Sequence, residues 1–306
     1  MNIDYYVLPD KLEEAKIDFE GHVKMMEVLA EMFGEYPFIK EKYGVAEFLW
    51  FPGAMEHQTI TGVSSNMISG KNFYEDTYVH ELAHQWWGNA VSPKSWKDIW
   101  LNEGFATYSE ALYYEAVSGA KALQSTMMSK YNTNFSGSLA NPGDFLFTRT
   151  MYDKGAWVLH MLRWEIGDSA FFETLRTYYE SFKYSNASIS DFKKVCEEVS
   201  KKNFDKFFEQ WVSREGIIEL EYKIDRQKSN GKYLVNIYLT QLQDEDVALE
   251  FPLEIKIAFA DDEESYFRYD ISTMDTTLEF TFDKKPGEID LDPNRWLLAV
   301  INSKYE

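Results

Sequence analysis

The hydrophobic pattern of this 306-residue chain changes its period near Glu215, and this change limits the fold more than any other feature. From residue 72 to about 213, apolar residues recur at a spacing of three and four, which predicts helices. After Gly216, short segments alternate apolar and polar side chains, which is typical of a β-sandwich. We therefore expect an α+β protein with two domains, a mainly helical domain over residues 1–215 and a small all-β sandwich over residues 216–306.

Individual elements can be predicted from the same pattern. Helical periodicity covers residues 11–33, 74–87, 103–117, 120–131, 153–166, 169–184, 191–202 and 204–212. Short β-rich segments predict strands at 4–8, 45–51 and 58–63, and in the sandwich at 220–224, 233–239, 253–259, 266–271, 278–282 and 289–291. Glycines 88, 119 and 167 fall just after helical runs, where helix ends favour glycine. Residues 131–150 are rich in Ser, Gly, Asn and Pro and have no period, which predicts a loop.

The composition excludes several classes of protein. The chain carries 51 acidic and 31 basic residues, a net charge of −20, which argues against nucleic acid or an anionic membrane as a partner. No segment approaches the roughly 18 consecutive apolar residues of a membrane-spanning helix. The aromatic share of 17% is far above that of disordered chains. Cys196 is the single cysteine and cannot form an internal disulfide. Oligomeric state and compartment stay open, and both a cytoplasmic and a periplasmic or secreted location are compatible with the sequence.

The segment YVHELAHQWW, residues 78–87, carries the strongest chemical signal. His80 and His84 are four residues apart in a helical pattern, so their side chains lie one turn apart on the same face. Two imidazoles in this arrangement can bind one Zn²⁺ ion. Glu81 is rotated about 100° from His80, beside the metal, where it can take a proton from a bound water. The alternative interpretation is a helix that only contains two histidines.

Glu103 is the candidate for a third ligand, because a catalytic zinc usually has three protein ligands and one open position. It lies in the segment WLNEG, separated from His84 by 18 residues, at the start of the next predicted helix. If the two helices pack antiparallel, Glu103 can reach the metal. Otherwise it is a carboxylate that interacts with the dipole at a helix N-terminus.

The motif HELAH, followed after 18 residues by the glutamate of WLNEG, resembles the aminopeptidase N family of gluzincin zinc metallopeptidases. Thermolysin-type enzymes share the ligand set, but they usually place an Asp four residues after the glutamate, where this chain has Thr107. The resemblance implies a thermolysin-like catalytic domain followed by the β-sandwich. It also implies one Zn²⁺ per chain, held by His80, His84 and Glu103, with Glu81 as the general base.

Residues 52–57, PGAMEH, resemble the G-A-M-E-N element of the family, with His57 in place of the last residue. The resemblance assigns substrate binding to Gly53, Ala54, Met55 and Glu56. Glu56 is then the group that binds the free α-amine of a peptide, which makes the enzyme an exopeptidase. The alternative for Glu56 is a carboxylate at a strand end that faces solvent.

The segment MYDKGA, residues 151–156, resembles the Y-x-K-G segment of the family. The resemblance implies that the hydroxyl of Tyr152 donates to the oxyanion of the tetrahedral intermediate. A neutral hydroxyl suits this task, since it stabilises charge that develops only in the transition state.

The family has an N-terminal β-domain and, in longer members, a C-terminal helical domain that this sequence does not match. We therefore expect the chain to be the middle two domains of a larger enzyme. Three functions stay open: a zinc aminopeptidase acting on peptides with a free N-terminus, a binding module or inactive fragment that keeps the zinc site, and a zinc endopeptidase. The first is preferred because the predicted ligands and base are all present.

Overall fold

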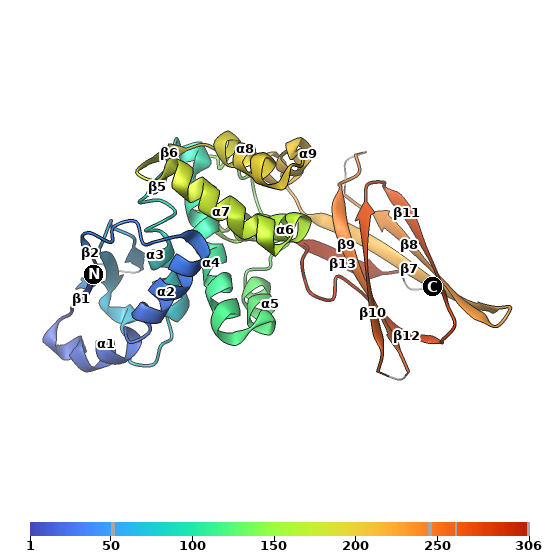
Figure 1. Ribbon diagram of the computed structural model, residues 1–306, viewed down its shortest axis with the longest axis horizontal. Coiled ribbons are helices and arrows are strands. Elements are labelled where there is room, and N and C mark those ends of the chain that lie inside the picture. Colours follow the sequence, from blue (N-terminus) through green and yellow to red (C-terminus); the bar gives the residue numbers. More distant parts are fainter. Residues whose placement is uncertain (50–52, 244–246, 261, 305–306) are drawn as a thin grey trace.

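The computed structural model describes residues 1–49, 53–243, 247–260 and 262–304. Figure 1 shows helices and a small sheet at one end and the strands that follow residue 217 at the other. The helices are α1 (Leu12–Asp18), α2 (His22–Phe33), α3 (Glu75–Ala83), α4 (Trp100–Ser118), α5 (Ala120–Ser129), α6 (Gly155–Ile166), α7 (Asp168–Phe182), α8 (Ile189–Ser200) and α9 (Asp205–Phe208). Two π-helical segments, η4 (Thr150–Lys154) and η5 (Glu209–Ser213), precede α6 and follow α9.

A four-stranded sheet opens the chain, in the order β1-β2-β4-β3. Its strands are β1 (Asn2–Tyr6), β2 (Lys42–Phe48), β3 (Ala54–Met55) and β4 (Thr61–Ser64). The pairs β1–β2 and β2–β4 are parallel, whereas β3 runs antiparallel to β4. Trp50 and Phe51 of the strand predicted over 45–51 lie outside the described residues, as does Pro52. A short parallel pair, β5 (Val91–Pro93) and β6 (Ser185–Ala187), lies further along the chain.

The remaining strands form the predicted sandwich. They are β7 (Ile218–Ser229), β8 (Lys232–Gln241), β9 (Phe251–Phe259), β10 (Glu264–Ile271), β11 (Asp275–Phe282), β12 (Pro286–Leu291) and β13 (Ala299–Ser303). One sheet has the order β10-β9-β12 and the other β11-β8-β7-β13. The sheets pack through phenylalanine rings, such as Phe267 against Phe280 at 5.0 Å between centroids. Because η5 ends at Ser213 and β7 begins at Ile218, we propose a domain boundary at residues 215/216.

The prediction of a single helix over residues 11–33 is wrong, because the chain turns between α1 and α2. The cause is a contact that the local pattern does not contain. The buried side chain of Asp18, the last residue of α1, accepts hydrogen bonds from the backbone N–H groups of Ser69, Gly70 and Asn72. The chain turns there, and α2 begins at His22.

The predicted helix over residues 74–87 also ends early, at Ala83. The chain turns back because the amides of Asn89 and Ala90 donate to the carbonyls of His84 and Gln85, at 3.0 and 3.1 Å. Gly88 therefore lies in this turn, at φ 129°, and does not cap the helix as expected. Gly119 and Gly167 do cap α4 and α6.

The helical part and the sandwich contact each other through a stack of flat groups. The ring of His160 in α6 stacks on Trp296, with centroids 4.6 Å apart, and Trp296 stacks on Trp164 at 5.1 Å. The guanidinium of Arg268 in β10 lies 4.4 Å from the centroid of the Trp164 ring. Trp296 belongs to the turn before β13, so this stack joins α6 to two segments of the sandwich.

We expect Trp296→Ala to lower the free energy of unfolding by about 2–3 kcal/mol, because a large partly buried ring leaves a gap between His160 and Trp164. Trp96→Ala is the matched control: the side chain of Trp96 is 61% exposed, and its loss should cost less than about 0.5 kcal/mol. Urea denaturation followed by circular dichroism measures both. Equal small effects would show that the stack does not stabilise the protein.

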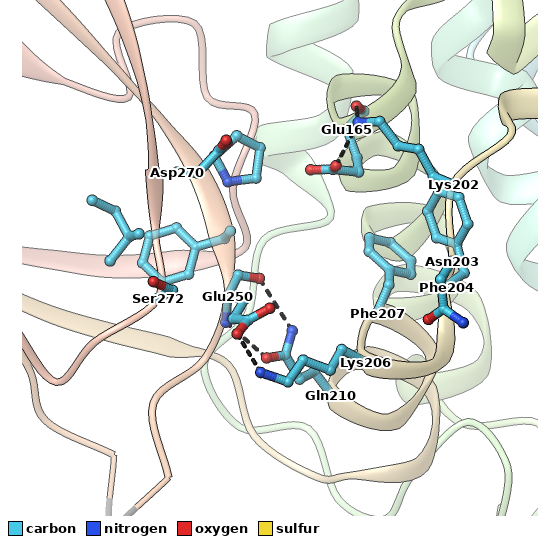
Figure 2. A pocket seen from close by; sticks show the side chains of 13 residues that line it. Glu165, Lys202, Asn203, Phe204, Lys206, Phe207, Gln210, Glu250, Asp270 and Ser272 are labelled. Atoms are coloured by element: carbon cyan, nitrogen blue, oxygen red, sulfur yellow. Dashed lines mark hydrogen bonds and ion pairs between the residues drawn. The ribbon is translucent and has the colours of Figure 1, made fainter.

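A pocket of about 260 Å³ lies at the same junction, between α6, the segment from α8 to η5, and the ends of β9 and β10 (Figure 2). Its polar groups pair with each other. Gln210 of η5 donates from Nε2 to the carbonyl of Glu250, at 3.1 Å, and accepts from the amide of Glu250, at 2.7 Å. Lys202 pairs with Glu165 at 2.9 Å. The two hydrogen bonds of Gln210 tie η5 to Glu250, next to the start of β9.

Candidate active site

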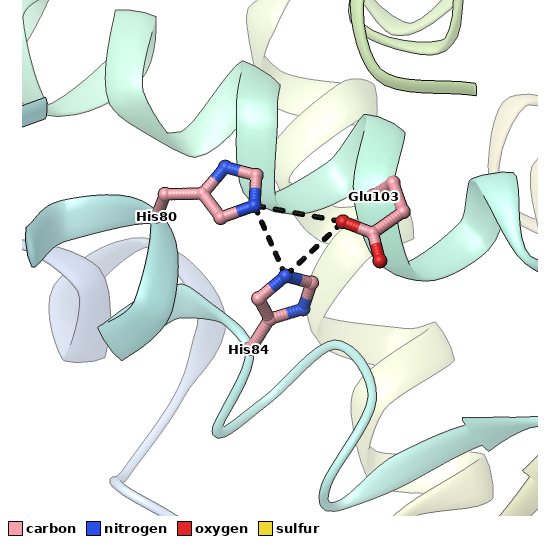
Figure 3. A group of neighbouring side chains, drawn as sticks. All are labelled: His80, His84 and Glu103. Atoms are coloured by element: carbon pink, nitrogen blue, oxygen red, sulfur yellow. Dashed lines mark hydrogen bonds and ion pairs between the residues drawn. The ribbon is translucent and has the colours of Figure 1, made fainter. Parts of the chain in front are cut away.

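The predicted metal ligands come from two neighbouring helices. His80 lies in α3, His84 is the C-cap residue of α3, and Glu103 lies in the first turn of α4. Nε2 of His80 and Nε2 of His84 are 3.1 Å apart, and Oε2 of Glu103 lies 3.5 and 3.3 Å from them (Figure 3). The structure therefore brings together all three residues that the sequence singled out as ligands.

The other ring nitrogens are held by acceptors. Nδ1 of His84 lies 2.8 Å from the carbonyl oxygen of Trp87, and Nδ1 of His80 lies 2.8 Å from Oε1 of Glu110. A carbonyl oxygen only accepts, so Nδ1 of His84 carries the hydrogen and Nε2 is left with its lone pair. The contact with Glu110 favours the same tautomer for His80. Both Nε2 atoms are thereby prepared to bind one cation.

The donor set fits zinc. Two imidazole nitrogens and one carboxylate oxygen are a common ligand set for catalytic Zn²⁺, and ligands about 2.1 Å from a tetrahedral ion lie about 3.4 Å from each other. The distances of 3.1, 3.3 and 3.5 Å between the donor atoms agree with this separation. Among the residues that the structure describes, this is the group of His, Cys, Asp and Glu side chains with ligand atoms close enough to hold a metal ion.

Electrostatics also favours a cation here. Burial raises the pKa of Glu103, but the two imidazoles outweigh this effect and hold it well below its usual range, so the side chain is a carboxylate. Burial lowers the pKa of His80, but hydrogen bonds to Glu103 and Glu110 outweigh it and raise the pKa to about 10. The negative charge that favours a proton on His80 equally favours a metal ion in place of that proton.

Glu81 is 7% exposed, and its Oε2 has no hydrogen-bond partner among the described residues. Burial raises the pKa of Glu81 to about 7, although His80 and His84 act to lower it. A buried carboxylate with a free oxygen and a pKa near neutrality is well suited to accept a proton. The charges of His80, His84 and Glu103 all act on the pKa of Glu81, so its carboxylate lies close to the predicted ligands.

Tyr152 lies in η4, and its ring stacks on His80 with centroids 5.9 Å apart. Burial, and then the charge of Glu103, raise the pKa of Tyr152. The phenol is therefore protonated at neutral pH and can donate a hydrogen bond. The helix predicted over 153–166 included only the last two residues of this π-helical turn and not Tyr152.

Glu56 follows β3, and its backbone is fixed by side chains that follow the predicted metal ligand His84 in the sequence. Its carbonyl accepts hydrogen bonds from Asn89 Nδ2, at 2.5 Å, and from Gln85 Nε2, at 3.4 Å. The charge of Glu56 contributes to raising the pKa of Glu81 and of Tyr152, so the carboxylate lies near both. His57, the departure from the family element, is exposed.

The other predicted substrate residues lie at a sheet edge. Ala54 and Met55 form β3, which pairs with β4 and is the last strand of the sheet as described. The carbonyl of Gly53 accepts from the amide of Ser64, at 3.0 Å. Gly53 has φ 129°, a conformation that L side chains rarely adopt, so the turn before β3 requires glycine.

Glu110 and Lys130 were not predicted as site residues. The second oxygen of Glu110, Oε2, pairs with Nζ of Lys130 at 2.6 Å, so one carboxylate joins His80 to a cation at the end of α5. Glu110 lies seven residues after Glu103, two turns along the same face of α4, and this spacing could have identified it. No sequence signal points to Lys130, whose contact depends on the packing of α5.

A contact between two glycines was also missed. A Cβ on Gly104 would lie 2.9 Å from the Cα and carbonyl carbon of Gly155, and a Cβ on Gly155 would lie 2.9 Å from the Cα of Gly104. Gly104 follows Glu103, and Gly155 follows the π-helical turn of Tyr152. The two functional helices therefore touch backbone to backbone, which fixes the distance between a predicted ligand and the predicted oxyanion donor.

Comparisons with known sequences place the chain among peptidases. Residues 17–211 match the peptidase family M1 domain. "Probable aminopeptidase 2" of Sulfurisphaera tokodaii is 28% identical over 266 residues, which are 74% of this chain and 33% of the relative. "Aminopeptidase N" of Streptomyces lividans is 30% identical over 214 residues, 62% of this chain and 25% of the relative. The chain thus spans at most about a third of these relatives.

Solved structures show the same fold. The structure of Legionella pneumophila aminopeptidase A in complex with aspartic acid aligns with 99% of this chain and 36% of its own, at a TM-score of 0.78 and 17% identity. A two-domain M1 zinc metallopeptidase, an E323A mutant bound to L-tryptophan, aligns with 63% of this chain and 44% of its own, at a TM-score of 0.53 and 30% identity. The predicted thermolysin-like catalytic fold followed by a β-sandwich is confirmed. In the described part of the chain, no helix is both long and apolar enough to span a bilayer.

The family match covers more than half of the chain, and the residues that resembled aminopeptidase N come together within it. A metal cofactor is the norm of this family. The chain belongs to peptidase family M1.

Proposed function

We propose that the chain is a zinc-dependent aminopeptidase that removes the N-terminal residue of peptides. The observation that carries this proposal is the triangle of donor atoms from His80, His84 and Glu103, with the free carboxylate oxygen of Glu81 beside it. The names of the relatives support the same activity, and the two solved structures hold free amino acids, the kind of product that an aminopeptidase releases.

In this proposal His80, His84 and Glu103 hold one Zn²⁺ per chain. The ion, when bound, supplies Lewis-acid chemistry, which polarises a carbonyl group and lowers the pKa of water. Glu81 takes the proton of the attacking water on a carboxylate oxygen and passes it to the nitrogen of the leaving amine. The water oxygen forms a bond to the carbonyl carbon, and the peptide C–N bond breaks.

Two further side chains act on the substrate, Tyr152 on the reacting carbonyl and Glu56 on the N-terminus. Tyr152 keeps its proton and donates a hydrogen bond to the oxygen that becomes negative in the transition state. Glu56 binds the α-ammonium group of the substrate as a charge-assisted hydrogen-bond acceptor. Gly53, Ala54 and Met55 offer backbone groups to the peptide along the β3 edge. Because Glu56 binds the α-ammonium group, only one residue fits between this carboxylate and the scissile bond, and the enzyme removes a single N-terminal residue.

Metal removal tests the zinc part of the proposal. We expect the purified chain to contain one zinc ion by mass spectrometry and to hydrolyse aminoacyl fluorogenic amides. Dialysis against a chelator should remove activity, and stoichiometric Zn²⁺ should restore it, whereas Mg²⁺ should not, because the nitrogen-rich donor set suits zinc. Full activity in metal-free protein would contradict the assignment.

The pH dependence tests the role of Glu81. The base acts only as a carboxylate, and the side chain is protonated below its pKa, so kcat/KM should fall as pH falls through about 7. The value of about 7 applies to Glu81 without a metal. A bound cation favours the carboxylate, so in the metal-loaded protein the midpoint of the fall in kcat/KM lies at a lower pH. The residual activity of Glu81→Gln should lack this acid limb. An identical limb in both proteins would assign the titration to another group.

A further inference from the structure

Lys154 is an unusual residue for its position. Its side chain is fully buried, at 0% exposure, at the junction of η4 and α6. Its ammonium donates a hydrogen bond to the carbonyl oxygen of Arg214, 60 residues further along the chain, at 3.0 Å. Burial lowers the pKa of Lys154 to about 8. A methionine of similar size would fill the space without the cost of burying a charge, so packing does not explain this lysine.

The bond joins two segments of the same rare kind. In η4, the amide of Gly155 donates to the carbonyl of Thr150, and after η5 the amide of Arg214 donates to the carbonyl of Glu209, at 3.1 Å. Both bonds join residues i and i+5, the spacing of a π-helix. Such turns are rare and occur frequently at functional sites, where surrounding contacts must hold them. Lys154 connects the end of one π-helical segment to the residue that follows the other.

The turn that carries Tyr152 is held from several sides. Gly155 lies against the backbone of Gly104, and the hydroxyl of Thr150 donates to the carbonyl of Ser136, at 2.9 Å. The bond from Lys154 adds an attachment to the end of η5. Through Gln210 and Glu250, η5 is in turn bound to the sandwich. The position of Tyr152 relative to His80 therefore depends on contacts made across the domain junction.

We propose that Lys154 is a positioning residue that fixes Tyr152 over the metal site by anchoring its π-helical turn to the segment before the sandwich. This inference rests on the proposed function, because it acts through the hydroxyl of Tyr152. A shift of about 1 Å in a group that stabilises the transition state can cost on the order of 100-fold in rate. The anchor also links the site to the sandwich, since η5, which precedes Arg214, is bound through Gln210 to Glu250 just before β9.

The test is a double-mutant cycle on the zinc-loaded full chain, with an aminoacyl fluorogenic amide as substrate. We expect Lys154→Met to lower kcat about 10- to 100-fold with less than a threefold change in KM and an unchanged zinc content. In a Tyr152→Phe background, the same change should lower kcat less than about threefold, because the group that it positions is gone. Lys154→Arg, which keeps a donor, should recover part of the loss.

Two further measurements separate positioning from a general structural effect. The affinity for a phosphinic transition-state analogue should fall in Lys154→Met by the same factor as kcat/KM. Lys202→Met is the matched control, because the ammonium of Lys202 also donates to a backbone carbonyl at the junction, that of Glu165 at 3.0 Å, but lies 51% exposed and away from η4. Its kcat should equal that of the wild type. If Lys154→Met does not fold, Lys154→Gln is compared in both backgrounds.

The outcomes are distinct. Equal losses from Lys154→Met in the wild type and in Tyr152→Phe would overturn the inference, as would a wild-type kcat. If Tyr152→Phe itself keeps the wild-type kcat, the proposed role of Tyr152 fails, and with it this part of the proposed function. A large loss from Tyr152→Phe together with none from Lys154→Met overturns only the inference about Lys154.

Discussion

Replacing Glu81 with glutamine is expected to lower kcat by at least about 10³-fold while the zinc content stays at one ion per chain. The amide has the size of the carboxylate but cannot accept the proton of the attacking water. General base catalysis commonly contributes about 10²–10⁴-fold, and Glu81 acts twice in the proposed reaction, once on the water and once on the leaving amine. Its Oε2 has no hydrogen-bond partner among the described residues, so this oxygen is free to accept the proton.

Steady-state kinetics on a fluorogenic amide and zinc analysis of the same sample measure this effect. Glu219→Gln is a suitable control, since Glu219 is an exposed residue of β7 and the same chemical change there should leave kcat unaltered. Thermal unfolding should show that Glu81→Gln is as stable as the wild type or more so, because a buried charge is removed. A kcat within tenfold of the wild type would exclude Glu81 as the base.

Gly155→Ala is expected to lower kcat at least about 100-fold and to weaken zinc binding at least tenfold. The new Cβ would lie 2.9 Å from the Cα of Gly104, whereas carbon atoms in contact are about 3.5–4.0 Å apart. The backbone atoms on both sides cannot rotate away, so α4 and the η4–α6 segment must separate. This separation moves Glu103 away from Tyr152, on which activity depends, and shifts Glu103 relative to His80 and His84, on which metal affinity depends.

The size of the effect distinguishes a close contact from an ordinary helix substitution. Gly155 begins α6, where alanine by itself would favour the helix, so a loss of stability of about 1–3 kcal/mol would have to come from overpacking. Gly21→Ala is the matched control: Gly21 has φ −70°, and its new Cβ would meet the flexible ends of two side chains, Met25 at 3.2 Å and Glu75 at 3.8 Å. Wild-type zinc affinity and kcat in Gly155→Ala would show that the helices can move apart without consequence.

That His80 and His84 lie together could be predicted because the information is local. His80 and His84 are one helical turn apart, and that spacing alone places both rings on one face. Glu103 needed a further condition, the packing of α4 against α3, and the resemblance to a family supplied it. The sandwich was predictable for the same reason as the histidines, since burial alternates with a period of two residues along most of β8, β10 and β11.

The features that escaped prediction depend on contacts between distant residues. The turn after Asp18 is stabilised by amides about 50 residues away, and nothing near α1 in the sequence indicates it. The π-helical turn of Tyr152 is held by Gly104, Ser136 and Arg214, which lie on three other segments. A periodicity of 3.6 residues does not describe a π-helical turn, so the predicted helix begins at residue 153, after Tyr152.

A comparison of two substrates that differ only at the N-terminus tests the central claim most directly. The zinc-loaded chain is given an alanine fluorogenic amide and its N-acetylated counterpart at equal concentrations, and initial rates are measured. If Glu56 binds the α-ammonium group, the free substrate is hydrolysed and the acetylated one at least about 100-fold more slowly, because acetylation removes the charge and leaves the carboxylate unpaired. Equal rates for the two substrates would contradict the assignment as an aminopeptidase.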